Sequence, residues 1–154
     1  MAEPAALQVE VFKAVRAAAP PAFIRQVLTR AATVPEIAAR LGPGPSTVAV
    51  RLTTDLELKG LNRSYAGEDH ATDVLSFAGS GDHLGDIAIS WPAVVRQSGE
   101  YRQPSATELA LLCVHGLLHL LAWDHASARE RKEMSRLTVQ ALELSRLRLA
   151  SGRL

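Results

Sequence analysis

Apolar and polar residues follow two different periods along this chain, and the first of these periods predicts strands. Leu7, Val9 and Val11 alternate with polar residues, and the same alternation returns from 48 to 52. A period of two is typical of a half-buried strand. Two more stretches rich in β-forming residues, 72–77 and 84–90, flank a glycine-containing turn, as in a hairpin. The pattern therefore predicts a small sheet of about four strands.

The second period, near 3.6 residues, predicts helices before, between and after these strands. Pro20 and Pro21 open the first helix, and residues 34–41 either extend it or form a short helix of their own. The remaining helices are expected at 55–65, 92–99, 105–121 and 127–149, with a polar loop at 67–70. We expect one α+β domain over residues 1–154, with a mixed sheet of about four strands packed against about five helices.

Two of the expected helices begin with the pattern of a capping box, in which a Ser and a Glu three residues later satisfy free amides of the first turn. Ser105 with Glu108 is the first pair, and Ser127 with Glu130 is the second. The helix after Ser105 is apolar on nearly every face, which indicates that it is buried at the centre of the domain.

This central helix also carries the candidate chemistry, in the stretch VHGLLHLLAWDH at 114–125. At about 100° per residue, His115 and His119 lie one turn apart on one face. His125 joins them only if the helix ends and the chain turns back. Offsets of 0, 4 and 10 match the histidines of zinc proteases that read H-E-x-x-H-x-x-G-x-x-H. Three imidazoles with an open fourth position are the ligand set of a catalytic zinc site.

The stretch differs from those proteases at two positions. Gly116 stands where they carry the glutamate that acts as general base, which counts against peptide hydrolysis by that mechanism. Ala122 stands where they turn on glycine. If the turn requires a positive φ, alanine raises its energy by about 1 kcal/mol; otherwise the turn has another geometry.

The composition of the chain bears on whether it folds and in which compartment it works. The chain has 154 residues, 47% hydrophobic and 21% charged, enough apolar material for a real core. No apolar run is long enough to span a membrane, and the first residues lack the basic start and apolar stretch of a secretory signal. The single Cys113 excludes an internal disulfide and is expected in the core. These features indicate a cytoplasmic protein.

The net charge of +1 is unevenly distributed. Residues 126–154 hold seven basic and three acidic side chains, whereas residues 1–125 carry a net charge of −3. A basic last helix is suited to nucleic acid, but a solvated helix face has the same composition, and charge alone leaves both interpretations open.

Several segments together resemble a known family. HGLLHLLAWDH at 115–125 resembles the signature H-G-x-L-H-L-x-G-[YH]-D-H of the YbeY family, bacterial factors for ribosomal RNA maturation and single-strand-specific endoribonucleases. Residues 61–65 resemble its L-N-x-x-Y, residues 72–77 its P-T-D-V-L-S-F, and residues 84–87 its L-G-D-I. The segments occur in family order and cover about 48–145.

The resemblance implies one Zn²⁺ per chain, held by His115, His119 and His125. It also implies processing of the 3′ end of small-subunit ribosomal RNA and a role in ribosome quality control, with ribosomal RNA and the small subunit as partners. His115 and Asp86 are the candidate catalytic residues, together with Arg63. Many members carry an Arg directly after the Tyr of L-N-x-x-Y, where this chain has Ala66, and Arg63 is the candidate to replace it.

Three functions compete at this point: a zinc-dependent endoribonuclease, a metallohydrolase of another substrate such as a peptide, and a non-catalytic ribosome assembly factor that contains zinc. Gly116 argues against the second, and Ala66 keeps the third open. Asp124 either orients an imidazole or caps the last helix. Asp73 is a candidate for lining the cleft, and Ser76 faces either the site or solvent. His70 and His83 are expected in solvated loops.

Overall fold

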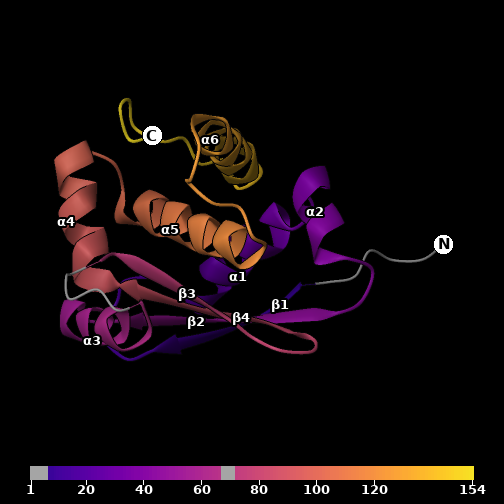
Figure 1. Cartoon of the computed structure of the whole chain (residues 1–154). Helices are drawn as coiled ribbons and strands as arrows, with labels where there is room; N and C mark the ends of the chain where they lie inside the picture. The colour runs from indigo at the N-terminus through magenta and orange to yellow at the C-terminus, as the bar shows by residue number, and fades with distance from the viewer. Residues whose placement is uncertain (1–6, 67–71) are drawn as a thin grey trace.

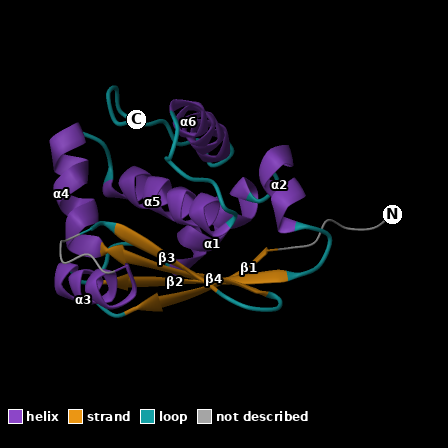
Figure 2. Cartoon of the chain, in the orientation of Figure 1, coloured by secondary structure: helices purple, strands orange, loops and turns teal. Residues whose placement is uncertain are grey.

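Four strands form a mixed sheet in the computed structural model, which describes residues 7–66 and 72–154. They are β1 (Leu7–Lys13), β2 (Ser46–Thr53), β3 (Val74–Ala78) and β4 (His83–Ser90), in the spatial order β1-β2-β4-β3. β1, β2 and β4 run parallel, and β3 pairs antiparallel with β4 through the predicted hairpin. Figure 2 shows the strands side by side beneath α5 and α6. The predicted mixed sheet is confirmed.

Helices α1 and α5 lie over one face of the sheet, and α6 lies over α5 on the side away from the sheet (Figure 1). The helices are α1 (Pro21–Ala31), α2 (Pro35–Leu41), α3 (Asp55–Leu61), α4 (Trp91–Tyr101), α5 (Ser105–Leu120) and α6 (Ala128–Glu143), and a short π-helix, η1 (Asn62–Ala66), follows α3. The α+β class is confirmed. One α-helix more than expected is present because residues 35–41 form a helix of their own.

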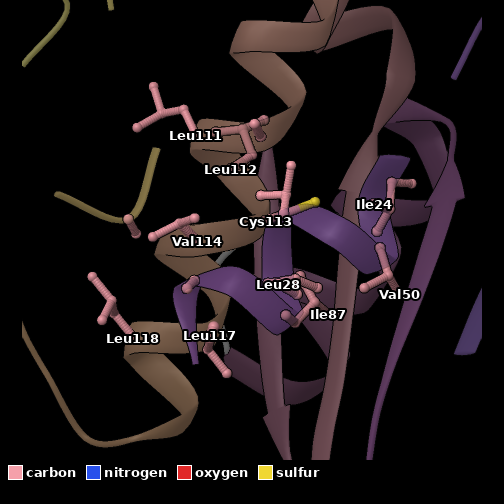
Figure 3. Close-up of a cluster of buried hydrophobic side chains, with 14 of the residues drawn as sticks. Ile24, Leu28, Val50, Ile87, Leu111, Leu112, Cys113, Val114, Leu117 and Leu118 are labelled. Atoms are coloured by element: carbon pink, nitrogen blue, oxygen red, sulfur yellow. The ribbon is translucent and has the colours of Figure 1, made fainter. Parts of the chain in front are cut away.

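The hydrophobic core lies between the sheet and the layer of α1 and α5 (Figure 3). Strand alternation sends Val48, Val50 and Ile87 into it, all fully buried. α5 contributes buried side chains along most of its length, as its apolar sequence predicted. Cys113 is fully buried there, and this burial raises the pKa of its thiol to about 12, so the expectation of a core cysteine is confirmed.

The start of α5 corrects one prediction, since Ser105 and Glu108 do not form a capping box. Pro104 is the N-cap, and the Ser105 hydroxyl lies 3.1 Å from that of Ser98. The Glu108 carboxylate is buried and pairs instead with Arg153, whose Nη2 is 2.7 Å from Oε2. The local pattern gave no sign of this distant partner. At the second pair, only the serine half of the capping box forms: the Ser127 hydroxyl accepts from the backbone N–H of Glu130, while Oε2 of Glu130 is buried without a hydrogen-bond partner.

The end of α6 corrects another prediction, because the helix stops at Glu143 rather than near 149. Arg146 adopts a positive φ of 58°, and the amides of Arg146 and Leu147 bond back to the carbonyls of Glu143 and Leu142. This hydrogen-bonding pattern is a Schellman motif, which ends a helix. The leucines beyond it continued the helical spacing in sequence, but Leu147 packs on the core from the segment after the helix.

The polar loop expected at 67–70, which includes His70, lies outside the described residues.

Within residues 7–66 and 72–154, no helix is both long and apolar enough to cross a membrane. The apolar helix α5 has 16 residues, fewer than the roughly 20 that a span requires.

Candidate metal centre

The structure brings the three predicted histidines together at the C-terminal end of α5. His115 and His119 project from its last turns and are partly buried, and His125 is exposed after the following turn. The ring centre of His125 lies 5.0 Å from that of His119 and 6.1 Å from that of His115. The chain therefore turns back after the helix, as the spacing of 0, 4 and 10 required.

These ring separations fit a shared divalent ion. Zn–N bonds of about 2.0–2.1 Å in tetrahedral geometry put the centres of two ligating imidazoles roughly 5 Å apart. In the described part of the chain, no group of three or more His, Cys, Asp or Glu side chains is already arranged as a finished metal site. The three imidazoles are nevertheless of the donor type that zinc takes.

Burial keeps the two helix histidines in the neutral form that metal binding requires. Loss of solvent is the main reason that the pKa of His115 falls from 6.5 to about 4. Loss of solvent also lowers the pKa of His119, and the charge of His125 adds to this effect. The negative charge of Asp124 and the backbone of Trp123 act in the opposite direction, raising the pKa of His119.

The turn that returns His125 is a Schellman motif at the end of α5. The Ala122 amide bonds to the carbonyl of His119, and the Trp123 amide bonds to that of Leu118. Ala122 has a φ of +70°, the left-handed conformation that this motif demands. The turn therefore has the glycine geometry considered above, and alanine tolerates it at a cost of about 1 kcal/mol.

Gly116 is needed for packing rather than for chemistry. A Cβ atom at this position would lie 2.6 Å from Cγ2 of Ile87 on β4, so residue 116 faces the sheet. Close by, the Ser76 hydroxyl donates to the Gly116 carbonyl at 2.9 Å, which ties β3 to α5 and shows that Ser76 faces the helix. A glutamate could not occupy position 116 without displacing β4, so the general base of the proteases has no counterpart here.

We expect Gly116→Ala to lower the free energy of unfolding by about 1–3 kcal/mol, because the new methyl group overpacks the contact with Ile87. Urea denaturation followed by circular dichroism measures this change. Gly99→Ala is the matched control, since Gly99 lies within α4 and a Cβ there meets nothing within 4 Å. The control is expected to keep or slightly raise stability. Equal losses in both variants would contradict the packing argument.

The structure does not bring Asp86 to the histidines. Asp86 lies on β4 next to Ile87, and because Ile87 faces α5, the Asp86 side chain lies on the opposite face of the sheet. There, Oδ1 of Asp86 is 3.0 Å from Nε2 of His83, whose Nδ1 is 2.7 Å from the Thr47 hydroxyl. His83 thus belongs to β4 and is only partly exposed, which corrects the expectation of a solvated loop.

The other candidate site residues are Arg63, Asp73 and Asp124, and the structure shows no contact of the Arg63 or Asp73 side chain with the three histidines among the described residues. Arg63 is exposed on η1, and no hydrogen bond, ion pair or ring contact among the described residues joins it to a histidine. Asp73 accepts a hydrogen bond from Gln97 at 3.1 Å. Asp124 accepts from the backbone amide of His125 at 2.6 Å and is not the cap of α6, which is Ser127. The capping alternative for Asp124 is therefore wrong.

One contact beside the histidines could not be foreseen from the sequence, although its residue was among the basic ones expected to meet RNA. Arg131, in the first turns of α6, donates from Nη1 to the carbonyl of His125 at 3.1 Å and is otherwise exposed. Arg129 and Lys132 are exposed on the same turns. The charge count pointed to this helix, but only the fold shows that its basic start adjoins the third histidine. A negatively charged substrate at the histidines would meet positive charge there.

A buried helix that presents three histidines at its end above a mixed sheet defines an α+β protein with a helix-borne histidine centre. The chain belongs to the YbeY family, since the sequence profile described as Endoribonuclease YbeY matches residues 10–145. This match begins well before residue 48, where the resemblance of the motifs became clear. The predicted family is therefore confirmed over most of the chain.

Individual relatives agree with this assignment. Endoribonuclease YbeY of Roseiflexus castenholzii is 44% identical over 121 residues, which cover 67% of this chain and 74% of the relative. Endoribonuclease YbeY of Moorella thermoacetica is 42% identical over 125 residues, covering 72% and 77%. The solution structure of TM1509 from Thermotoga maritima is similar in fold, with a TM-score of 0.60 at 23% identity, over 90% of this chain and 92% of that one.

Proposed function

We propose that this protein is a zinc-dependent endoribonuclease that cleaves single-stranded RNA in the maturation of ribosomal RNA. The proposed substrate is the 3′ end of small-subunit ribosomal RNA, with the small ribosomal subunit as partner and ribosome quality control as the setting. The gathering of three imidazoles at the end of α5, in a chain of the YbeY family, is the observation that carries this proposal.

His115, His119 and His125 would hold the ion. A divalent metal at such a centre supplies positive charge that polarises a phosphoryl oxygen and makes water a better nucleophile. The protein supports this chemistry by keeping His115 and His119 neutral, because burial lowers the pKa of both imidazoles. The exposed position of His125 leaves the centre open on one side to a large substrate.

Single-stranded RNA suits the surroundings of the centre. Arg129, Arg131 and Lys132 offer positive charge beside His125 for a phosphate backbone. A flexible strand reaches the in-line geometry of phosphodiester hydrolysis more readily than a duplex does. Peptide hydrolysis is disfavoured, because position 116 faces Ile87 and holds no general base for it. A non-catalytic assembly factor with the same metal is the alternative that the experiment must separate.

The experiment compares two substrates and measures the metal in the same preparation. Purified protein is incubated with labelled ribosomal RNA fragments, single-stranded and duplex, and with a peptide library, while elemental analysis gives zinc per chain. We expect about one zinc per chain, slow cleavage of the single strand and no peptide products. Zinc without RNA cleavage would favour the assembly-factor alternative, and metal-dependent peptide cleavage would contradict the substrate class.

We expect loss of the two exposed cations Arg129 and Lys132 to weaken RNA binding and make it less dependent on salt. Each phosphate contact to a single strand contributes about 0.7 to the slope of log affinity against log salt, so Arg129→Gln with Lys132→Gln should reduce the slope by up to about 1.4. Arg131 is left intact because it also holds the His125 carbonyl. Fluorescence anisotropy at several salt concentrations measures the slope.

The control variant removes two positive charges from a part of the surface away from α6. Lys13 and Lys59 are exposed on β1 and α3, away from α6, and both are changed to glutamine. Should this control reduce the slope as much as the α6 variant, net charge rather than a docking surface would explain RNA binding. An unchanged slope in the α6 variant would mean that the basic residues form an ordinary solvated helix face.

A further inference from the structure

A guanidinium from a distant helix holds the turn that carries His125. Arg40, on the last turn of α2, donates from Nη1 to the carbonyl of Leu121 at 3.0 Å. Its Cζ also lies 3.6 Å from the centre of the Trp123 ring. Arg40 thus contacts the residue before Ala122 and the residue after it, and Ala122 is the residue with the positive φ. Arg40 itself lies about eighty residues earlier in the chain.

The turn needs such support from outside. Carbonyls in the last turn of a helix have no partner within the helix, and Leu121 is the C-cap of α5. Ala122 does not favour the left-handed conformation by itself, so neighbouring contacts must hold it. Trp123 is only 3% exposed, which anchors the middle of the turn in the core.

The position of Trp123 bears on two of the three histidines. The amides of Ala122 and Trp123 bond to the carbonyls of His119 and Leu118, so the turn is tied to the backbone that carries His119. His125 follows Trp123 by two residues, so a shift of Trp123 moves His125 as well. The ring centres of His119 and His125 are 5.0 Å apart. Because the turn lies between these two residues, its conformation determines that distance.

We propose that Arg40 is a positioning residue for the three-histidine centre: by stacking on Trp123 and bonding to Leu121, it sets the distance between His119 and His125. Only arginine does both, because its planar guanidinium stacks on a ring while its edge donates a hydrogen bond. Lysine keeps the charge without the stacked plane. The part of this proposal that concerns zinc rests on the function proposed above, whereas the ring geometry does not.

The test uses Arg40→Met and Arg40→Lys in the full chain, with Arg30→Met as the matched control. Arg30 is an exposed arginine of α1 whose Nη1 makes a long contact of 3.4 Å with the Ser145 hydroxyl, away from the turn. Zinc affinity is measured by competition with a coloured chelator. We expect it to fall about 10-fold in Arg40→Met, in the range found when groups around metal ligands are altered, and by less in Arg40→Lys. The control should match the wild type.

A second readout works without metal. In the metal-free protein, nuclear Overhauser contacts between the ring protons of His119 and His125 should be present in the wild type and in Arg30→Met, and weakened in Arg40→Met. Unchanged ring contacts and unchanged zinc affinity in a folded Arg40→Met protein would overturn the proposal, as would equal losses in Arg30→Met. If the wild type binds no zinc, the proposed metal dependence fails, and the ring contacts still decide the role of Arg40.

Discussion

Replacing His115 with alanine is expected to reduce RNA cleavage by about 100-fold or more. Altering groups that merely surround metal ligands typically lowers metal affinity or activity by roughly 10- to 100-fold, so loss of a direct ligand should exceed that range. His115 is also the member of the cluster whose pKa burial lowers to about 4, and His83, the described histidine outside the cluster, lies on the opposite face of the sheet. Cleavage of a labelled single-stranded ribosomal RNA fragment under initial-rate conditions measures the loss.

The control for this prediction is His83→Ala, which removes the same kind of side chain from the opposite face of the sheet. We expect its cleavage rate to stay near that of the wild type. Residual cleavage in His115→Ala at the wild-type rate would identify a contaminating nuclease and remove the catalytic claim. A large loss in His83→Ala would instead show that the face holding His83 and Asp86 takes part in the reaction.

Replacing Arg153 with methionine is expected to lower the free energy of unfolding by about 3–5 kcal/mol, because it leaves a buried carboxylate without its charged partner. The Glu108 side chain is fully buried, and that of Arg153 is 14% exposed. Arg153 donates to both oxygens of Glu108 through Nε and Nη2. In Arg153→Met, the Gln103 amide is the side-chain donor that remains, at 3.1 Å from Oε1. Urea denaturation measures the change.

Two further variants separate the buried charge from a simple loss of contact. Arg96→Met breaks the exposed pair with Asp55 and should change stability far less than Arg153→Met does, because solvent screens an exposed ion pair. Glu108→Met combined with Arg153→Met removes both charges and should recover much of the loss, since buried ion pairs are often replaceable by apolar side chains. If the double variant were as unstable as Arg153→Met, the unpaired carboxylate would not be the cause.

The features that could be predicted from sequence are those with a local period. Alternation gave the strands, and the offsets of 0, 4 and 10 gave the three histidines that the fold brings together. The family followed from short motifs in the right order, and the profile match extends it to residue 10. In each case, the signal comes from short stretches of the chain, each about a dozen residues or fewer.

The features that sequence could not give depend on partners far along the chain. Glu108 appeared to cap its own helix because the pattern contains no trace of Arg153. Asp86 lay near the end of a predicted strand, but only the packing of Ile87 on α5 shows which face its side chain occupies. Arg40 carries no motif at all, and its role depends on α2 lying against the turn after α5.

The positive φ of Ala122 has a consequence for how relatives are found. Patterns for histidine centres of this kind require the letter G at this position, and such a pattern would pass over this chain although the backbone has the required shape. The turn requires a left-handed backbone conformation and not glycine itself. Contacts from other parts of the chain, such as those of Arg40, allow alanine to adopt this conformation at a cost of about 1 kcal/mol. A search that scores the left-handed turn and the three histidines, instead of the glycine, would recover proteins that share the architecture with another residue there.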